Sequence, residues 1–231
     1  MRFYVIFLVV LFSIKVYAQP NYNADLLDTL GQIGNSNTPA KHFAKLYYQT
    51  IVITNNHISR QPENIRKFVF GFEARFASYF FNSYHNFLTN QPQDIIWQRY
   101  YSDTAFSELQ YQFMGMNAHI NGDMGKSLSD IYCLDTLKRY TPYLLKFQRS
   151  LNGLFDSIYL QTKKYKKIKR LHLLTLGTDK ILGKRLILRW RKKQVHLAQL
   201  YHSNKKKYER ISRRLRKKMN HNEHFALHWI K

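Results

Sequence analysis

Apolar residues recur along most of the chain at intervals of three or four, which is the spacing of one face of an α-helix. After Pro62 this face runs through Ile65, Phe68, Val69, Phe72, Phe76 and Phe80, predicting a helix to about residue 88. The same spacing predicts helices over residues 21–32, 40–55, 92–101, 126–138, 141–159 and 181–201. No run of alternating apolar and polar residues bounded by turn residues stands out. The pattern predicts an all-α fold, a single bundle of about six to seven helices.

The central stretch, QYQFMGMNAHINGD over residues 110–123, places polar side chains inside an apolar run. As a helix it has one face with Phe113, Asn117, Ile120, Asn121 and Met124, and a second with Gln112, Met116, His119 and Asp123. Faces of mixed polarity are typical of a helix in the middle of a bundle. A buried polar group without a partner costs about 1–3 kcal/mol, so the stretch predicts a hydrogen-bond network or a site. We expect Asn121 and Gly122 to end this helix.

His119 and Asp123 are the candidate catalytic residues, because a separation of four places their side chains next to each other on a helix. Three interpretations remain open. The pair can be structural and fix the register of the bundle. It can hold a divalent metal, with Glu73 as the preferred third ligand and with Glu108, His57 and His196 as further candidates. It can also act without a metal, with Asp123 orienting His119 as a general base.

Asn117, Asn121 and Arg191 are the candidate ligand-binding residues. Asparagine is unfavourable inside a helix, so the two amides are expected to bridge helices or contact a ligand. Arg191 can pair with a carboxylate such as Glu73 or Asp123, or it can be one more solvated cation.

Charge divides the chain unevenly. Residues 19–160 carry 12 Lys and Arg against 11 Asp and Glu, whereas residues 161–218 carry 22 against two. We expect an all-α domain over residues 19–203 and a basic tail over residues 204–231. Such a tail fits anionic lipid head groups or polyanions. Nucleic acid is not expected, because aromatic residues that would stack on bases are sparse among the cations.

The first residues predict export. Residues 1–18 read as a signal peptide, with an apolar core over residues 3–14 and Ala18 before the cleavage point. The protein is then expected in the periplasm or outside the cell, with no membrane span in the mature chain. The single cysteine, Cys133, excludes an internal disulfide and is expected to be a small buried residue.

The phrase MGMNAHINGD over residues 114–123 resembles the GMNAHIN-x-D motif of a bacterial family that carries only a domain-of-unknown-function label. Weaker similarities lie in FAKLYYQT over residues 43–50, in residues 72–80 and in residues 189–191, so the resemblance spans roughly residues 38–201. Gly122 and Gly125 depart from the bulkier residues usual in that family. The resemblance implies an all-helical bacterial domain and no established chemistry.

Two functions are therefore expected. The first is a metal-dependent hydrolase-like or small-ligand-binding protein with its site at His119 and Asp123. The alternative is a non-catalytic envelope protein that binds anionic surfaces through the basic last third of the chain. No phosphate-binding glycine loop, cysteine-rich metal pattern or serine-hydrolase motif narrows the choice further.

Overall fold

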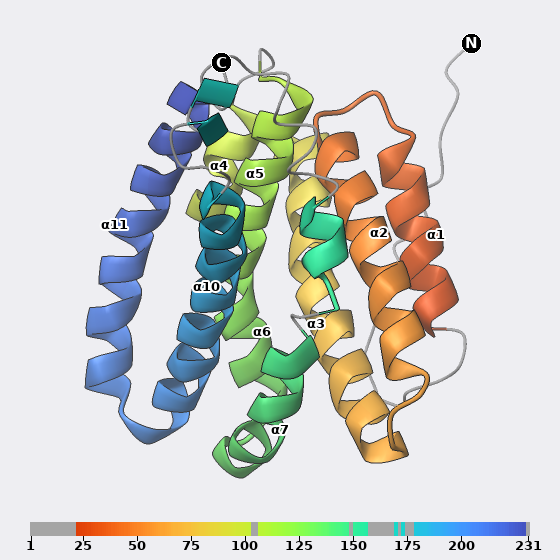
Figure 1. The fold of residues 1–231 in the computed structure, drawn as a ribbon, viewed down its shortest axis with the longest axis vertical. Helices are drawn as coiled ribbons and strands as arrows, with labels where there is room; N and C mark the ends of the chain where they lie inside the picture. The colour runs from red at the N-terminus through yellow and green to blue at the C-terminus, as the bar shows by residue number, and fades with distance from the viewer. Residues whose placement is uncertain are drawn as a thin grey trace.

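The prediction of an all-α bundle is confirmed by a computed structural model of the chain (Figure 1). The structure describes residues 22–102, 106–147, 150–156, 169–170, 172–173 and 178–229. The predicted signal peptide, residues 1–18, lies outside these ranges and stays a prediction. Among the described residues there is no β-strand, and no helix there is both long and apolar enough to cross a membrane.

Three N-terminal helices form one side of the bundle. Helix α1 (Tyr22–Gly34) packs against α2 (Ala40–Ile58), and α3 (Glu63–Leu88) runs beside them. Prolines lie directly before α2 and α3, at Pro39 and Pro62, where the absence of a backbone N–H costs no helical hydrogen bond. The inner faces of these helices supply most of the aromatic residues of the core.

The middle of the molecule is an almost continuous rod formed by α5 (Glu108–Ala118), a π-helical turn η1 (His119–Asp123) and α6 (Met124–Ile131). A capping box between Ser107 and Gln110 starts this rod. Helix α4 (Ile95–Tyr101) packs against α5. Figure 1 shows the rod between α10 and α11 on one side and α1, α2 and α3 on the other.

The expected helix end at Asn121 and Gly122 is wrong, because the chain continues from α5 through η1 into α6. In η1 the Met124 N–H donates to the carbonyl of His119, five residues back, which widens the turn without ending the helix. Gly122 serves close packing instead of a turn, since a Cβ there would lie 2.4 Å from Ile96 Cδ1. Gly125 likewise gives room to Gln194, 2.6 Å from such a Cβ.

Two further boundaries differ from the prediction. The helix expected over residues 126–138 is broken at Tyr132, which has extended backbone (φ −124°, ψ 133°). Helix α7 (Leu134–Phe147) then runs through Pro142, where a new helix was expected to begin. The expected burial of Cys133 is also wrong: it lies exposed between α6 and α7, with its Sγ 3.3 Å from Thr136 Oγ1.

Helices α10 (Thr178–Ser203) and α11 (Lys205–Trp229) form a hairpin at the C-terminal end of the described chain. Helix α10 packs on α6 and α7, and α11 packs on α5 and α10. Residues 205–229, most of the segment assigned to a basic tail, form helix α11, while the boundary of the domain stays a prediction. Met219 is 4% exposed, and its carbonyl accepts a hydrogen bond from Asn117 Nδ2 at 3.2 Å.

This packing predicts that α11 contributes to the stability of the bundle. Met219→Ala should lower the free energy of unfolding by about 2–5 kcal/mol, because it removes a buried side chain and leaves a cavity against α5. The neighbouring substitution Lys218→Ala should change it by less than about 0.5 kcal/mol, since Lys218 is exposed. Urea unfolding followed by circular dichroism measures both, and equal effects would show that α11 does not pack as described.

Candidate functional site

The structure buries the six residues named as catalytic, ligand-binding or preferred metal-binding candidates. They come from α3, α5, η1 and α10, and each is less than one tenth exposed: Glu73 5%, Asn117 0%, His119 2%, Asn121 8%, Asp123 1% and Arg191 6%. The expectation that polar groups lie deep among packed helices is confirmed. Some of these groups form hydrogen bonds with one another, and others have no partner among the described residues.

His119 and Asp123 form the contact that their spacing predicts. His119 Nδ1 lies 3.1 Å from Asp123 Oδ2 across the π-helical turn. The same oxygen accepts a hydrogen bond from Trp97 Nε1 on α4 at 3.0 Å. The carboxyl group is thus fixed from two sides, and it in turn fixes the plane of the imidazole ring.

Aromatic side chains enclose the imidazole on its other sides. Phe76 on α3 stacks on His119 with 3.5 Å between the ring centroids and 9° between the planes. Tyr47 and Phe43 on α2 meet the ring edge-on, at 4.8 and 5.5 Å. Burial is therefore the main cause that lowers the pKa of His119 well below its usual value, and the positive charge of Arg191 lowers it further. The imidazole is neutral at neutral pH.

The burial of Asp123 acts in the opposite direction on an acid. It raises the pKa of this carboxyl group well above the usual value, while the charge of Lys126 and the Trp97 hydrogen bond lower it. Asp123 Oδ1 and His119 Nε2 have no hydrogen-bond partner among the described residues. Each atom of the pair that faces away from the shared contact is thus unsatisfied.

The two asparagines join helices to one another. Asn121 Nδ2 donates to Asn117 Oδ1 at 2.9 Å, and the Asn117 amide donates to the Met219 carbonyl on α11. Gln194 on α10 donates to the Asn121 carbonyl at 2.8 Å. These contacts match the interpretation in which Asn117 and Asn121 bridge helices. The ligand contact suggested for them stays a prediction.

Glu73 and Arg191 are buried near each other but form no ion pair within the described part of the chain. Burial raises the pKa of Glu73 to about 8, so this carboxyl group is protonated at neutral pH. The Thr54 side chain and the charge of Arg191 act in the opposite direction and lower this pKa, but burial has the larger effect. Burial lowers the pKa of Arg191 to about 10, which leaves the guanidinium charged and its Nε unpaired.

A small cavity of about 70 Å³ lies beside these groups. Helices α2, α3, α5, η1 and α10 and the short segment 151–155 enclose it, and its lining includes Tyr47, Thr50, Phe76, His119 and Arg191. Asp123 does not line it, although His119 does. His119 Nδ1 is turned toward Asp123, and Nε2 is buried without a hydrogen-bond partner among the described residues.

Among the described residues, the structure brings no third metal ligand to His119 and Asp123. Within the ranges that the structure describes, no three His, Cys, Asp or Glu side chains are grouped so that they could hold a metal ion. Glu108 instead accepts a hydrogen bond from Gln112, and His196 is exposed on α10. A metal held by His119, Asp123 and Glu73 therefore stays a prediction, and the described site is a His–Asp pair beside an arginine.

Three members of the site were not predicted from the sequence: Trp97, Phe76 and Tyr47. Phe76 and Tyr47 are apolar-face residues of helices, and nothing local distinguishes them from other core aromatics. Trp97 offered one usable signal, since a buried indole N–H needs an acceptor. That signal does not say which of the acidic residues is the acceptor.

The raised pKa of Glu73 predicts a pH dependence of stability. The folded protein keeps this proton up to about pH 8, whereas the unfolded chain loses it near 4.5. The contribution of Glu73 to the free energy of unfolding is therefore greatest below pH 4.5. It falls by about 1.4 kcal/mol per pH unit up to pH 8. In Glu73→Gln this slope should disappear, so the variant should gain on the wild type as pH rises.

Urea unfolding at a series of pH values between 5 and 8 tests this, with the exposed Glu63→Gln as the matched control. A difference between Glu73→Gln and wild type that stays constant with pH would contradict the protonated state of Glu73.

Comparison with known proteins places the chain in a family. No curated protein and no solved structure matches it. A protein family described as "Family of unknown function (DUF5995)" matches residues 24–227, a range that runs from α1 into α11 and contains the whole polar cluster. The match covers most of the 231 residues and agrees with the resemblance to a domain of unknown function. The chain belongs to the DUF5995 family.

Proposed function

We propose that the protein binds a small anionic ligand in the cavity beside Arg191 and His119, and that the His119–Asp123 pair serves as an acid–base group toward it. The observation that carries this proposal is a buried, charged guanidinium that forms no ion pair with a carboxylate among the described residues. Charges removed from water need compensation, and Glu73, the carboxyl group whose charge would act on Arg191, is protonated at neutral pH. An anionic oxygen in the cavity would supply what the chain lacks.

The size of the cavity limits what it can hold. A cavity needs only about 10–15 Å³ of free space to hold one water, so about 70 Å³ has room for several water-sized groups. Pockets for whole drug-sized molecules measure about 300–1,000 Å³. The cavity therefore suits a carboxylate, or a reacting carbonyl with one water, and the remainder of a larger ligand would have to pass the segment 151–155.

The orientation of His119 supports acid–base chemistry. With Nδ1–H donated to Asp123, Nε2 keeps a lone pair for a proton, as in the histidine–carboxylate pairs of hydrolases. In a hydrolytic step a water proton passes to Nε2 while the water oxygen bonds to the carbonyl carbon. The bond to the leaving group then breaks as the proton moves from Nε2 to that group. Arg191 would stabilise the oxyanion formed in between.

Anion binding is tested with Arg191→Met and acetate as the probe. Removal of an unpaired buried charge should raise the free energy of unfolding in anion-free buffer by about 1–4 kcal/mol. In wild type, acetate at 100 times its Kd should stabilise by about 2.7 kcal/mol, and this gain should vanish in Arg191→Met. Thermal unfolding with and without acetate measures both quantities.

Arg189→Met is the matched control, because Arg189 is exposed on the same helix. It should leave the acetate response unchanged. His119→Asn should weaken the response while the protein stays folded. If Arg191→Met lowers stability and acetate stabilises all variants equally, the cavity is a structural feature and the proposal fails.

A second function, binding to anionic surfaces, is favoured by the exposed face of α11. Its cations between residues 205 and 218 are exposed, and none of them forms an ion pair within the described residues. Met219 anchors the opposite face to the bundle. A fixed helix presents its charges as one surface, which fits anionic lipid head groups or polyanions. With the predicted signal peptide, we propose that this contact takes place outside the cytoplasm.

This second function predicts binding to phosphatidylglycerol vesicles that weakens steeply with salt. Replacing the three lysines at residues 205–207 by glutamine should cost about 1 kcal/mol of vesicle affinity for each lysine. Replacing Lys41, Lys45 and Lys67, which lie on α2 and α3, is the control for net charge alone. Vesicle co-sedimentation over a range of sodium chloride concentrations measures the affinity, and equal losses in the two variants would exclude α11 as the contact surface.

A further inference from the structure

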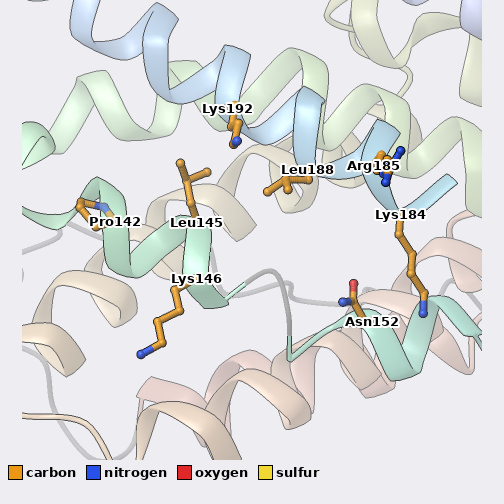
Figure 2. A pocket seen from close by; sticks show the side chains of 8 residues that line it. All are labelled: Pro142, Leu145, Lys146, Asn152, Lys184, Arg185, Leu188 and Lys192. Atoms are coloured by element: carbon orange, nitrogen blue, oxygen red, sulfur yellow. The ribbon is translucent and has the colours of Figure 1, made fainter. Parts of the chain in front are cut away.

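A second and larger cavity, of about 590 Å³, lies between α7, the segment 150–156 and α10. Figure 2 shows the eight side chains that line it: Pro142, Leu145, Lys146, Asn152, Lys184, Arg185, Leu188 and Lys192. Its volume is within the range of about 300–1,000 Å³ that pockets for small organic molecules have. None of these residues lines the small cavity at His119, so the two cavities have separate walls.

The charges of this cavity all have one sign. Its lining has four cations and no acidic side chain. Lys184 is partly neutralised, because its Nζ lies 2.6 Å from Asp156 Oδ1. Lys146, Arg185 and Lys192 are exposed and form no ion pair within the described residues. Figure 2 shows the Lys146 side chain pointing away from α10, so Arg185 and Lys192 are the cations on the α10 wall that favour an anionic group.

The rest of the lining is apolar. Leu145 projects from α7 and Leu188 from α10 into the space between the two helices (Figure 2). Pro142 adds a further apolar surface, at the point where α7 continues through a proline. A fully hydrated ion such as free phosphate would leave these side chains without a partner. A molecule with an apolar body and an anionic head would contact both kinds of surface at once.

We infer that this cavity binds a soluble amphiphilic anion, with a carboxylate at Arg185 or Lys192 on the α10 wall and an alkyl body against Leu145 and Leu188. A flat lipid surface fits less well, because the apolar side chains lie inside the hollow between two helices and the segment 150–156. The site shares no residue with the exposed face of α11 or with the cavity at His119. It therefore stands independently of the functions proposed above.

The test uses decanoate below its micelle concentration, measured by isothermal titration calorimetry. Decanoate should bind at least about tenfold more tightly than decyltrimethylammonium, which has the same body and the opposite charge, or inorganic phosphate, which lacks the body. All titrations are repeated in the Arg191→Met background. Decanoate binding that persists there cannot come from the cavity at His119.

Variants locate the binding site. Arg185→Gln combined with Lys192→Gln should weaken decanoate binding about tenfold or more, since hydrogen bonds to charged groups are among the stronger ones. The pair Arg189→Gln and Lys193→Gln removes equal charge from the same helix outside the cavity and should change the affinity little. Leu188→Asn should weaken decanoate binding while leaving the charges in place. Circular dichroism checks that each variant is folded.

Each other outcome would overturn the inference. Equal losses in the two double variants would mean attraction by net charge alone. Phosphate binding as tight as decanoate binding would mean a simple anion site. Binding only to phosphatidylglycerol vesicles would mean that the basic helices meet a membrane surface instead of a soluble molecule.

Discussion

The fold depends on the need of one buried helical turn for hydrogen-bond partners. Residues 117–123 place two amides, an imidazole and a carboxyl group where water does not reach. Three of its partners come from three other helices: the Trp97 indole from α4, the Gln194 amide from α10 and the Met219 carbonyl from α11. Because an unpaired buried polar group costs about 1–3 kcal/mol, these contacts fix the positions of three helices that hydrophobic packing alone would place less specifically.

The π-helical form of this turn is part of the same solution. A hydrogen bond from Met124 N–H to the His119 carbonyl spans five residues, so one residue more than usual fits into the turn. Such widened turns are rare and occur often at functional sites. Here it carries both His119 and Asp123, and it brings the carboxyl group within reach of α4. Ile96, also on α4, packs closely against Gly122 and so joins the same two elements.

Local spacing predicted what is local. The helical period identified the elements, and a separation of four predicted the His119–Asp123 contact. The partners of the site could not be predicted, because Trp97, Gln194 and Met219 are brought to the turn by tertiary packing across long stretches of chain. The prediction at Gly122 was wrong because glycine occurs both at helix ends and where two segments pack closely. The contact with Ile96, which the sequence does not reveal, distinguishes the two cases.

In helix α11 the sequence does contain the apolar spacing of a packed helix, but its many cations led to the prediction of a tail. Tyr208, Ile211, Leu215 and Met219 recur every three or four residues, which is the spacing of a packed face. The dense cations around them suggested a tail. Cations on the remaining faces do not oppose packing, since their charged ends reach water while one apolar stripe is buried.

The polar turn is unevenly satisfied. On one side the asparagines and the Asp123 oxygen that faces Trp97 have partners that tie helices together. On the other side His119 Nε2 and Arg191 Nε have no hydrogen-bond partner among the described residues, and both residues line the small cavity. Unsatisfied buried groups of this kind cost about 1–3 kcal/mol each. A ligand present at 100 times its Kd returns about 2.7 kcal/mol to the folded state, which is the same order. The free-energy cost of these unsatisfied groups is therefore of the size that the binding of one small anion can offset. Two apolar residues at the same positions would have no such cost.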